Sequence, residues 1–73
     1  MDDRHARNVF RDRRRVWDAL PSVSSWAPGA RAEEVAERLE LPVRVVEHHL
    51  RELEADGLAS RAGERFRRRG QLR

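Results

Sequence analysis

The 73-residue sequence contains no cysteine, no tyrosine and no lysine, and only 5% of its residues are aromatic. Without cysteine, the chain forms no disulfide and offers no thiol nucleophile or thiolate metal ligand. No apolar run approaches the roughly 20 residues that a membrane-spanning helix needs. The first ten residues are acidic and then basic without an apolar stretch, which is not the pattern of a secretory signal. We therefore expect a cytoplasmic protein without membrane contact.

Charged residues make up 40% of the chain, and all 16 basic residues are arginines. The positive charge lies at the two ends. Residues 1–20 contain six arginines and four acids, and residues 61–73 contain six arginines and one acid. Residues 21–60, in contrast, contain four arginines and eight acids. Basic ends suit a polyanionic partner, because arginine makes bidentate contacts with phosphate and guanine. Two solvated tails would give the same charge pattern, so charge alone leaves both interpretations open.

The spacing of apolar residues predicts a first helix over residues 4–20, which ends at Pro21. Arg13 falls in the centre of the apolar side of this helix. Either its stem reaches out to solvent, or the packed helix begins near Asp12 and residues 1–11 form an N-terminal arm. Residues 21–30 are rich in proline, serine and glycine and predict a loop, with a short strand around residues 25–27 as an option.

Two further helices are predicted in the middle of the chain. The second covers residues 31–39 and the third covers residues 42–56, with Pro42 in its first turn and Gly57 as a left-handed C-cap. The apolar residues expected on their buried sides are Ala32, Val35, Ala36 and Leu39 in the second helix and Val43, Val46, Leu50 and Leu53 in the third.

The last part of the sequence predicts a β-hairpin over residues 58–69, because its residues alternate on both sides of a turn at Gly63. Phe66 is the large apolar residue of the second strand and is expected to face the core. Residues 70–73 are expected to be a flexible tail. Residues 1–73 then form one mainly α domain of the α+β class, with three helices and a C-terminal hairpin.

Two short helices followed by a basic hairpin are typical of a helix-turn-helix with a wing. The segment from residue 32 to residue 63 reads AEEVAERLELPVRVVEHHLRELEADGLASRAG, and it resembles the winged helix domains of the MarR and ArsR regulator superfamily. Glu40 stands where that superfamily usually has glycine, and Pro42 stands where it has a serine or threonine cap. The resemblance implies a small stand-alone regulator of the phage or plasmid kind.

The resemblance also implies that residues 42–56 are a recognition helix in the DNA major groove. Helical spacing places Arg44, His48 and Arg51 opposite the buried side, with Val45 and Glu47 on the flanks. The expected base contacts are Arg44, Val45, Glu47 and His48. The arginines expected on the DNA backbone lie at the end of this helix and on the hairpin: Arg51, Arg61, Arg65, Arg67, Arg68 and Arg69.

Other functions have less support in the sequence. Adjacent histidines on a helix point about 100° apart, so His48 and His49 predict no metal site, and His49 is expected to be packed and hydrogen-bonded. No residue pattern indicates catalysis, a cofactor or a small-molecule substrate. Trp17 and Trp26 are expected in the core, which leaves single-strand binding without the exposed aromatic residues that it needs.

The function that these patterns predict is sequence-specific binding of double-stranded DNA by a nucleoid-associated transcriptional regulator. A winged helix used for protein–protein interaction without direct DNA contact is the alternative, because residues 21–60 are acidic. A homodimer through the first helix is a further expectation, with Val9, Phe10 and Arg13 as contacts. A monomer in which Phe10 folds back on its own core is equally compatible with the sequence.

Overall fold

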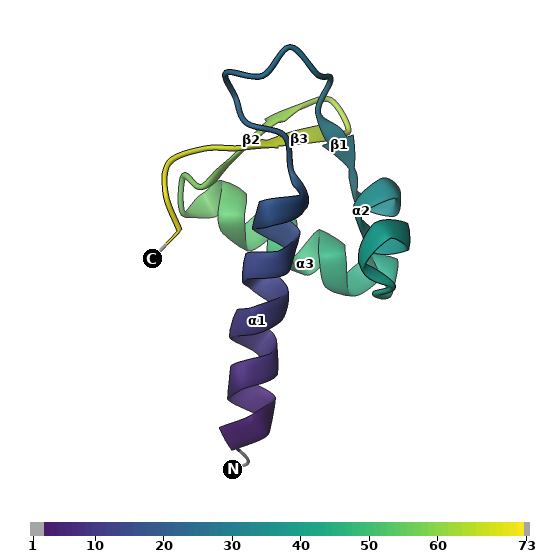
Figure 1. The fold of residues 1–73 in the computed structure, drawn as a ribbon, viewed down its shortest axis with the longest axis vertical. Coiled ribbons are helices and arrows are strands. Elements are labelled where there is room, and N and C mark those ends of the chain that lie inside the picture. Colours follow the sequence, from purple (N-terminus) through teal and green to yellow (C-terminus); the bar gives the residue numbers. More distant parts are fainter. Residues whose placement is uncertain (1–2, 73) are drawn as a thin grey trace.

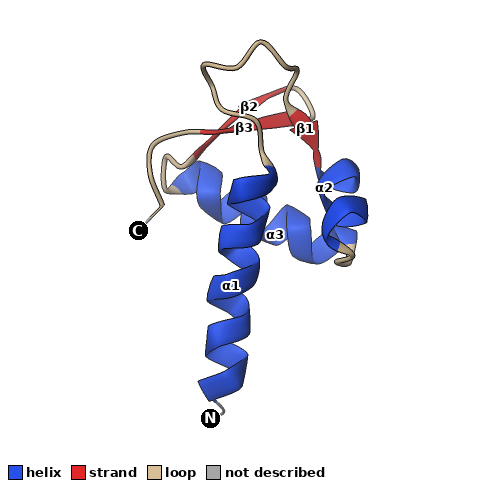
Figure 2. Ribbon diagram, in the orientation of Figure 1, coloured by secondary structure: helices blue, strands red, loops and turns tan. Residues whose placement is uncertain are grey.

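The computed structural model describes the backbone of residues 3–72 and the side chains of residues 11–72. Its elements follow one another as α1 (Asp3–Ala19), β1 (Ala30–Arg31), α2 (Ala32–Leu39), α3 (Val43–Ala55), β2 (Ala59–Ala62) and β3 (Arg65–Arg68) (Figure 1). The strands form one antiparallel sheet in the order β1-β3-β2, and the helices lie together on one side of it (Figure 2). The described part of the chain is therefore a mainly helical α+β fold, as predicted.

Helix α1 begins at Asp3, so its backbone continues without a break into the part that packs on the core. This is the continuous-helix option of the two that the sequence left open for residues 3–11. Val16 is fully buried on its inner side and Trp17 is half-buried, and Leu20, directly after the helix, is buried as well. The chain leaves helical geometry at Leu20, the residue before Pro21, because the proline ring disfavours the helical conformation there.

A tight turn joins α2 to α3. The Glu34 carboxylate accepts a hydrogen bond from the Arg31 backbone N–H at 3.1 Å, which satisfies one free donor at the start of α2. Glu40 ends α2 in the left-handed conformation, with φ 57°. Pro42 precedes the first residue of α3, and Gly57 follows α3 with φ 75°, the left-handed C-cap that the sequence predicted.

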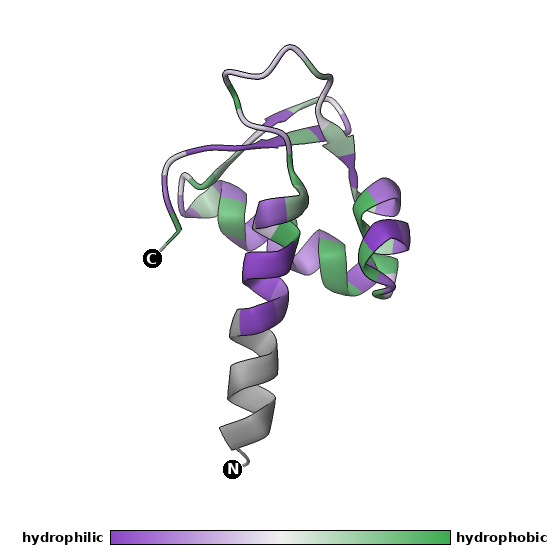
Figure 3. Cartoon of the chain, viewed as in Figure 1, coloured by the Kyte–Doolittle hydropathy of each residue, from purple (hydrophilic) through white to green (hydrophobic). Residues whose placement is uncertain are grey.

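The core lies between the three helices and the inner face of the sheet. Apolar and hydrophilic residues follow one another around the helices in Figure 3, as expected for helices with one buried side. The buried apolar side chains come from every layer: Val16, Leu20, Ala32, Val35, Ala36, Val46, Leu50, Leu53, Ala59 and Phe66. Leu39 is partly buried against this core.

The prediction of a buried Val43 was wrong, because α3 begins at this residue and its side chain lies at the helix end, 37% exposed. The prediction of a buried Trp26 was also wrong: its side chain is fully exposed. The Ser25 hydroxyl accepts a hydrogen bond from the Ala27 backbone N–H at 3.1 Å. The loop thus satisfies backbone groups beside Trp26 locally and leaves the ring in solvent.

The hairpin formed by β2 and β3 is confirmed, with Gly63 in a left-handed turn at φ 63° and Phe66 buried. A strand was expected around residues 25–27, but β1 lies at Ala30–Arg31 and pairs Ala30 with Phe66. Gly29 permits this pairing, because a Cβ there would lie 2.9 Å from the Phe66 carbonyl oxygen. The expected tail is in part docked, since Leu72 packs against the core.

Candidate nucleic-acid interface

Helix α3 exposes one side to solvent. Arg44, Glu47, His48 and Arg51 are exposed, and Val45 is half-buried at the border with the core. The opposite side carries the buried apolar stripe of the same helix. Of the four residues predicted as base contacts, Arg44, Glu47 and His48 are therefore on the exposed part of α3, whereas Val45 lies at its border with the core.

A groove of about 310 Å³ separates this side of α3 from the hairpin. It places Arg51 of α3 near Arg61 of β2, but it also contains three carboxylates. The residues that line it are Ala32, Glu33, Glu47, Leu50, Arg51, Arg61, Gly63, Glu64 and Phe66. The groove is mixed in charge, so the local field is weaker than the arginine content of the chain suggests.

The hairpin arginines do not form one surface. Successive side chains of a strand point to opposite faces, so the pleat divides them. Arg61 lies opposite Phe66 on the inner face and forms an ion pair with Glu54 of α3 at 3.5 Å. Arg68 lies over the Trp17 ring, 5.5 Å from its centroid, in a cation–π contact. These two side chains contact the helical layer.

Arg65 and Arg67 lie on the other face of the sheet, where they contact the loop between α1 and β1. Arg65 donates to the Gly29 carbonyl oxygen at 2.8 Å, and Arg67 donates to the Ser25 carbonyl oxygen at 3.4 Å. Arg69 follows β3 and is exposed. We predicted these arginines as one set of DNA-backbone contacts, because sequence position alone does not show which residues a strand will contact.

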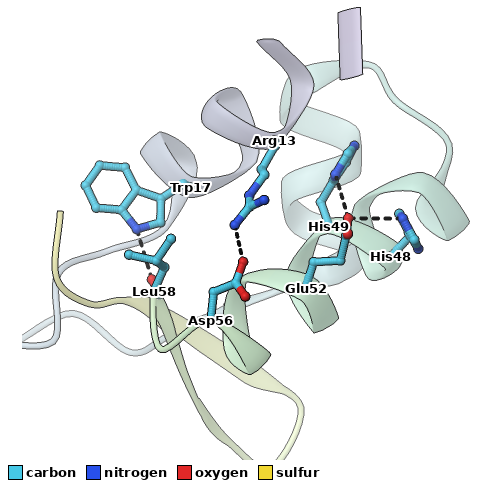
Figure 4. Close-up of polar contacts among 7 residues, drawn as sticks. All are labelled: Arg13, Trp17, His48, His49, Glu52, Asp56 and Leu58. Carbon is cyan, nitrogen blue, oxygen red and sulfur yellow. Dashed lines mark hydrogen bonds and ion pairs between the residues drawn. The ribbon is translucent and has the colours of Figure 1, made fainter. Parts of the chain in front are cut away.

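Arg13 lies between α1 and α3 and forms an ion pair with Asp56 at the end of α3 (Figure 4). This contact explains why a charged residue can occupy the apolar side of α1. The aliphatic part of the Arg13 side chain is covered, and its guanidinium reaches a carboxylate of the same chain. The expected dimer contact through Arg13 thus has an intramolecular competitor. Val9 and Phe10, the other two expected dimer contacts, lie outside the residues whose side chains are described.

The two histidines of α3 flank Glu52 (Figure 4). His48 is exposed, with its Nε2 3.1 Å from a Glu52 carboxylate oxygen, whereas the His49 Nδ1 lies 3.8 Å from the same oxygen. His49 is buried as predicted, but its Nδ1 has no hydrogen-bond partner among the described residues. No group of three potential metal ligands occurs in the described part of the chain.

Burial lowers the pKa of His49, because the charged imidazolium would lose its hydration between α1 and α3. The neighbouring His48 and Arg13 act in the same direction, whereas Glu52 and Asp12 oppose them. His49 is therefore a neutral core residue at neutral pH, and the exposed His48 is the histidine of α3 that a ligand can reach.

Comparison with protein-family models, with curated proteins and with solved structures gives no match for this chain. Among the described residues, no helix combines the length and the apolar character needed to cross a membrane.

Proposed function

We propose that this chain is a winged helix-turn-helix domain that binds duplex DNA with α3 in the major groove. The observation that carries the proposal is the exposed side of α3, with Arg44 in its first turn and Arg51 two turns later, beside the hairpin groove. An α-helix fits the B-DNA major groove, and helix-turn-helix proteins contact base edges from the first turns of the recognition helix. The tight turn at Glu40 and the hairpin after α3 agree with this docking mode.

Each exposed residue then has a separate role. Arg44 donates to guanine O6 and N7, Val45 contacts a thymine methyl, and Glu47 accepts from a cytosine amino group. His48 lies one turn after Arg44 on the same side and completes the base-contact set. Arg51 and Arg61 bind phosphates on either side of the groove.

Of the other four predicted phosphate contacts, the geometry excludes three and keeps one. Arg65 and Arg67 lie on the face of the sheet that points away from α3, and Arg68 covers Trp17, so we assign none of them to the duplex contacted by α3. Arg69 is exposed directly after β3 and keeps a backbone-contact role in the proposal.

Fluorescence anisotropy with a random-sequence duplex pool, followed by selection of the bound sequences, tests the proposal. Arg44→Ala should cost about 1–3 kcal/mol on a selected site and little on random duplex, because a base contact acts only on the matching base. Arg38→Ala is the matched control, since Arg38 is exposed on α2 and lines a different groove. An equal loss on both DNAs would reduce Arg44 to a phosphate contact, and absence of binding to either would refute the proposal.

A second candidate function, docking of a protein partner, is favoured by one observation. Glu33, Glu47 and Glu64 share the groove with two arginines, which disfavours a polyanion at that point. The two functions differ in the effect of Glu64→Gln. If DNA covers this groove, the substitution should raise affinity for random duplex, because it removes a like-charge repulsion. Lack of duplex binding at low salt in both forms favours the protein partner.

A further inference from the structure

Trp26 lies in solvent at full exposure on the loop between α1 and β1, and Val23 of the same loop is 45% exposed. Figure 1 shows this loop arching beyond the sheet, away from the three helices. A large aromatic side chain at full exposure gains nothing from burial in its own fold. Its free faces are available for contact with a ligand.

The loop that carries Trp26 is anchored on both sides of it. Arg67 donates to the carbonyl oxygen of Ser25 and Arg65 donates to that of Gly29. The Val23 backbone N–H also donates to the Arg68 carbonyl oxygen at 3.1 Å. These bonds tie the backbone around Trp26 to β3, so the loop presents the ring at a defined place beside the sheet.

The sheet face next to this loop is basic. A groove of about 170 Å³ lies there, and no carboxylate belongs to its lining, which includes Ser60, Ala62, Arg65 and Arg67. Arg31 of β1 is paired with Arg65 in the sheet register and adds an exposed cation to the same face, beside the half-buried Arg65 and Arg67. One carboxylate, Glu34, lies 3.4 Å from Arg65 and offsets part of its charge.

We propose that this second surface, formed by Trp26, Arg31, Arg65 and Arg67, binds single-stranded nucleic acid. Trp26 stacks on an unpaired base while the arginines hold the adjacent phosphates, the combination found in sequence-tolerant single-strand sites. The exposed aromatic decides for a single strand over a duplex, because base pairs within a duplex already stack on one another and offer no free face. Since this surface lies across the sheet from α3, the proposal goes beyond duplex binding and does not depend on it.

The test uses the full chain and a 12-nucleotide oligothymidylate at low salt, with a random 12-base-pair duplex as the second probe. Trp26→Ala should weaken oligothymidylate binding about tenfold or more, and Trp26→Phe should retain most of the affinity, because stacking needs an aromatic ring. Val23→Ala is the matched control, since it shortens an exposed apolar side chain of the same loop and should change nothing. In the wild type, saturating oligothymidylate should protect from acrylamide the part of the tryptophan fluorescence that Trp26→Phe lacks, which is the emission of Trp26 and not of Trp17.

Three results would overturn the proposal. These are equal affinity of wild type and Trp26→Ala for oligothymidylate, unchanged acrylamide access to Trp26 at saturation, and no oligothymidylate binding by the wild type. A fourth comparison separates the two surfaces. Arg44→Ala should leave oligothymidylate binding unchanged. If it weakens this binding as much as Trp26→Ala does, the single strand lies on α3 and the second surface is refuted. Duplex binding that survives in Trp26→Ala keeps the α3 proposal independent of this outcome.

Discussion

Two buried polar atoms of the described side chains, Nε of Arg13 and Nδ1 of His49, have no hydrogen-bond partner, and both lie between α1 and α3. An unpaired buried polar group is destabilising by about 1–3 kcal/mol. The two residues differ in the neighbouring charges that offset this cost. The Arg13 guanidinium forms an ion pair with Asp56, which is half exposed, so the net contribution of this pair to stability is small. The Glu52 carboxylate oxygen lies 3.8 Å from the His49 Nδ1, but burial still lowers the pKa of His49, so this residue responds to pH.

Stability should therefore depend on pH through His49. In the unfolded chain its pKa is about 6.5, and burial lowers it in the fold. Between these two values the unfolded state binds more protons, so the free energy of unfolding falls as the pH falls. The full contribution of neutral His49 is present above pH 6.5 and is lost as the pH drops through the folded pKa. Urea unfolding at pH 8, 7, 6 and 5.5 should show this decline.

His49→Leu should remove most of that decline, because the position no longer titrates and leucine fills a similar volume. The charged groups that face His49 stay in place in this variant: Asp12 and Arg13 on α1, and His48 and Glu52 on α3. His48→Gln is the control and should keep the wild-type pH dependence, since His48 is exposed. A decline of the same size in His49→Leu would assign the pH dependence to other groups.

At the scale of elements, the turn between α2 and α3 contains a local strain. Glu40 has φ 57° and ψ 42°, a conformation that costs a residue with a Cβ roughly 1–2 kcal/mol. Glu40→Gly should relieve the strain, although glycine also gains entropy in the unfolded chain. We expect a net stabilisation of about 0.5–1 kcal/mol, or a Tm higher by roughly 2–6 °C. Thermal unfolding followed by circular dichroism measures it.

Glu40→Ala separates strain from charge in this experiment. It removes the same carboxylate but keeps a Cβ in the left-handed conformation, so its Tm should stay below that of Glu40→Gly. Equal melting temperatures for the two variants would show that the strain at this turn has no measurable cost.

The elements differ in how far the sequence predicts them. The helices and the hairpin were predicted because their signals are local: helical spacing, Pro42 at the start of α3, and glycines at the end of α3 and in the hairpin turn. Strand β1 was missed because it has two residues and exists through its pairing with Arg65 and Phe66, far along the chain. Trp26 was misplaced for a related reason, since nothing near it in sequence shows that its loop leaves the core.

The candidate sites were predictable to different degrees for the same physical reason. The exposed side of α3 follows from the helical period, so the positions of Arg44 and His48 could be derived. The division of the hairpin arginines between two faces depends on which face of the sheet the helices cover. That choice is made by Phe66 and Ala59 packing inward, and its consequence for Arg65 and Arg67 is seen only in the folded chain.

At the scale of the whole molecule, the fold distributes its positive charge over two surfaces. The α3 side has Arg44, Arg51 and Arg61, whereas the far face of the sheet has Arg31, Arg65 and Arg67. The net charge of +3 therefore understates the positive charge of each surface, and it overstates the positive field in the mixed groove next to α3. A polyanion bound at one surface should release counterions according to the arginines of that surface alone.

The salt dependence of duplex binding measures how many phosphates the protein neutralises. With about three phosphates neutralised by Arg51, Arg61 and Arg69, the slope of log K against log salt concentration should be about −3. Arg51→Ala should make the slope less steep by about one. Arg67→Ala should leave it unchanged, because Arg67 faces the other way. A slope of about −5 or steeper, or an equal effect of both substitutions, would mean that the duplex contacts arginines of both faces. A slope near −1 would instead support the protein partner, because too few phosphates would then be held to fix a duplex on α3.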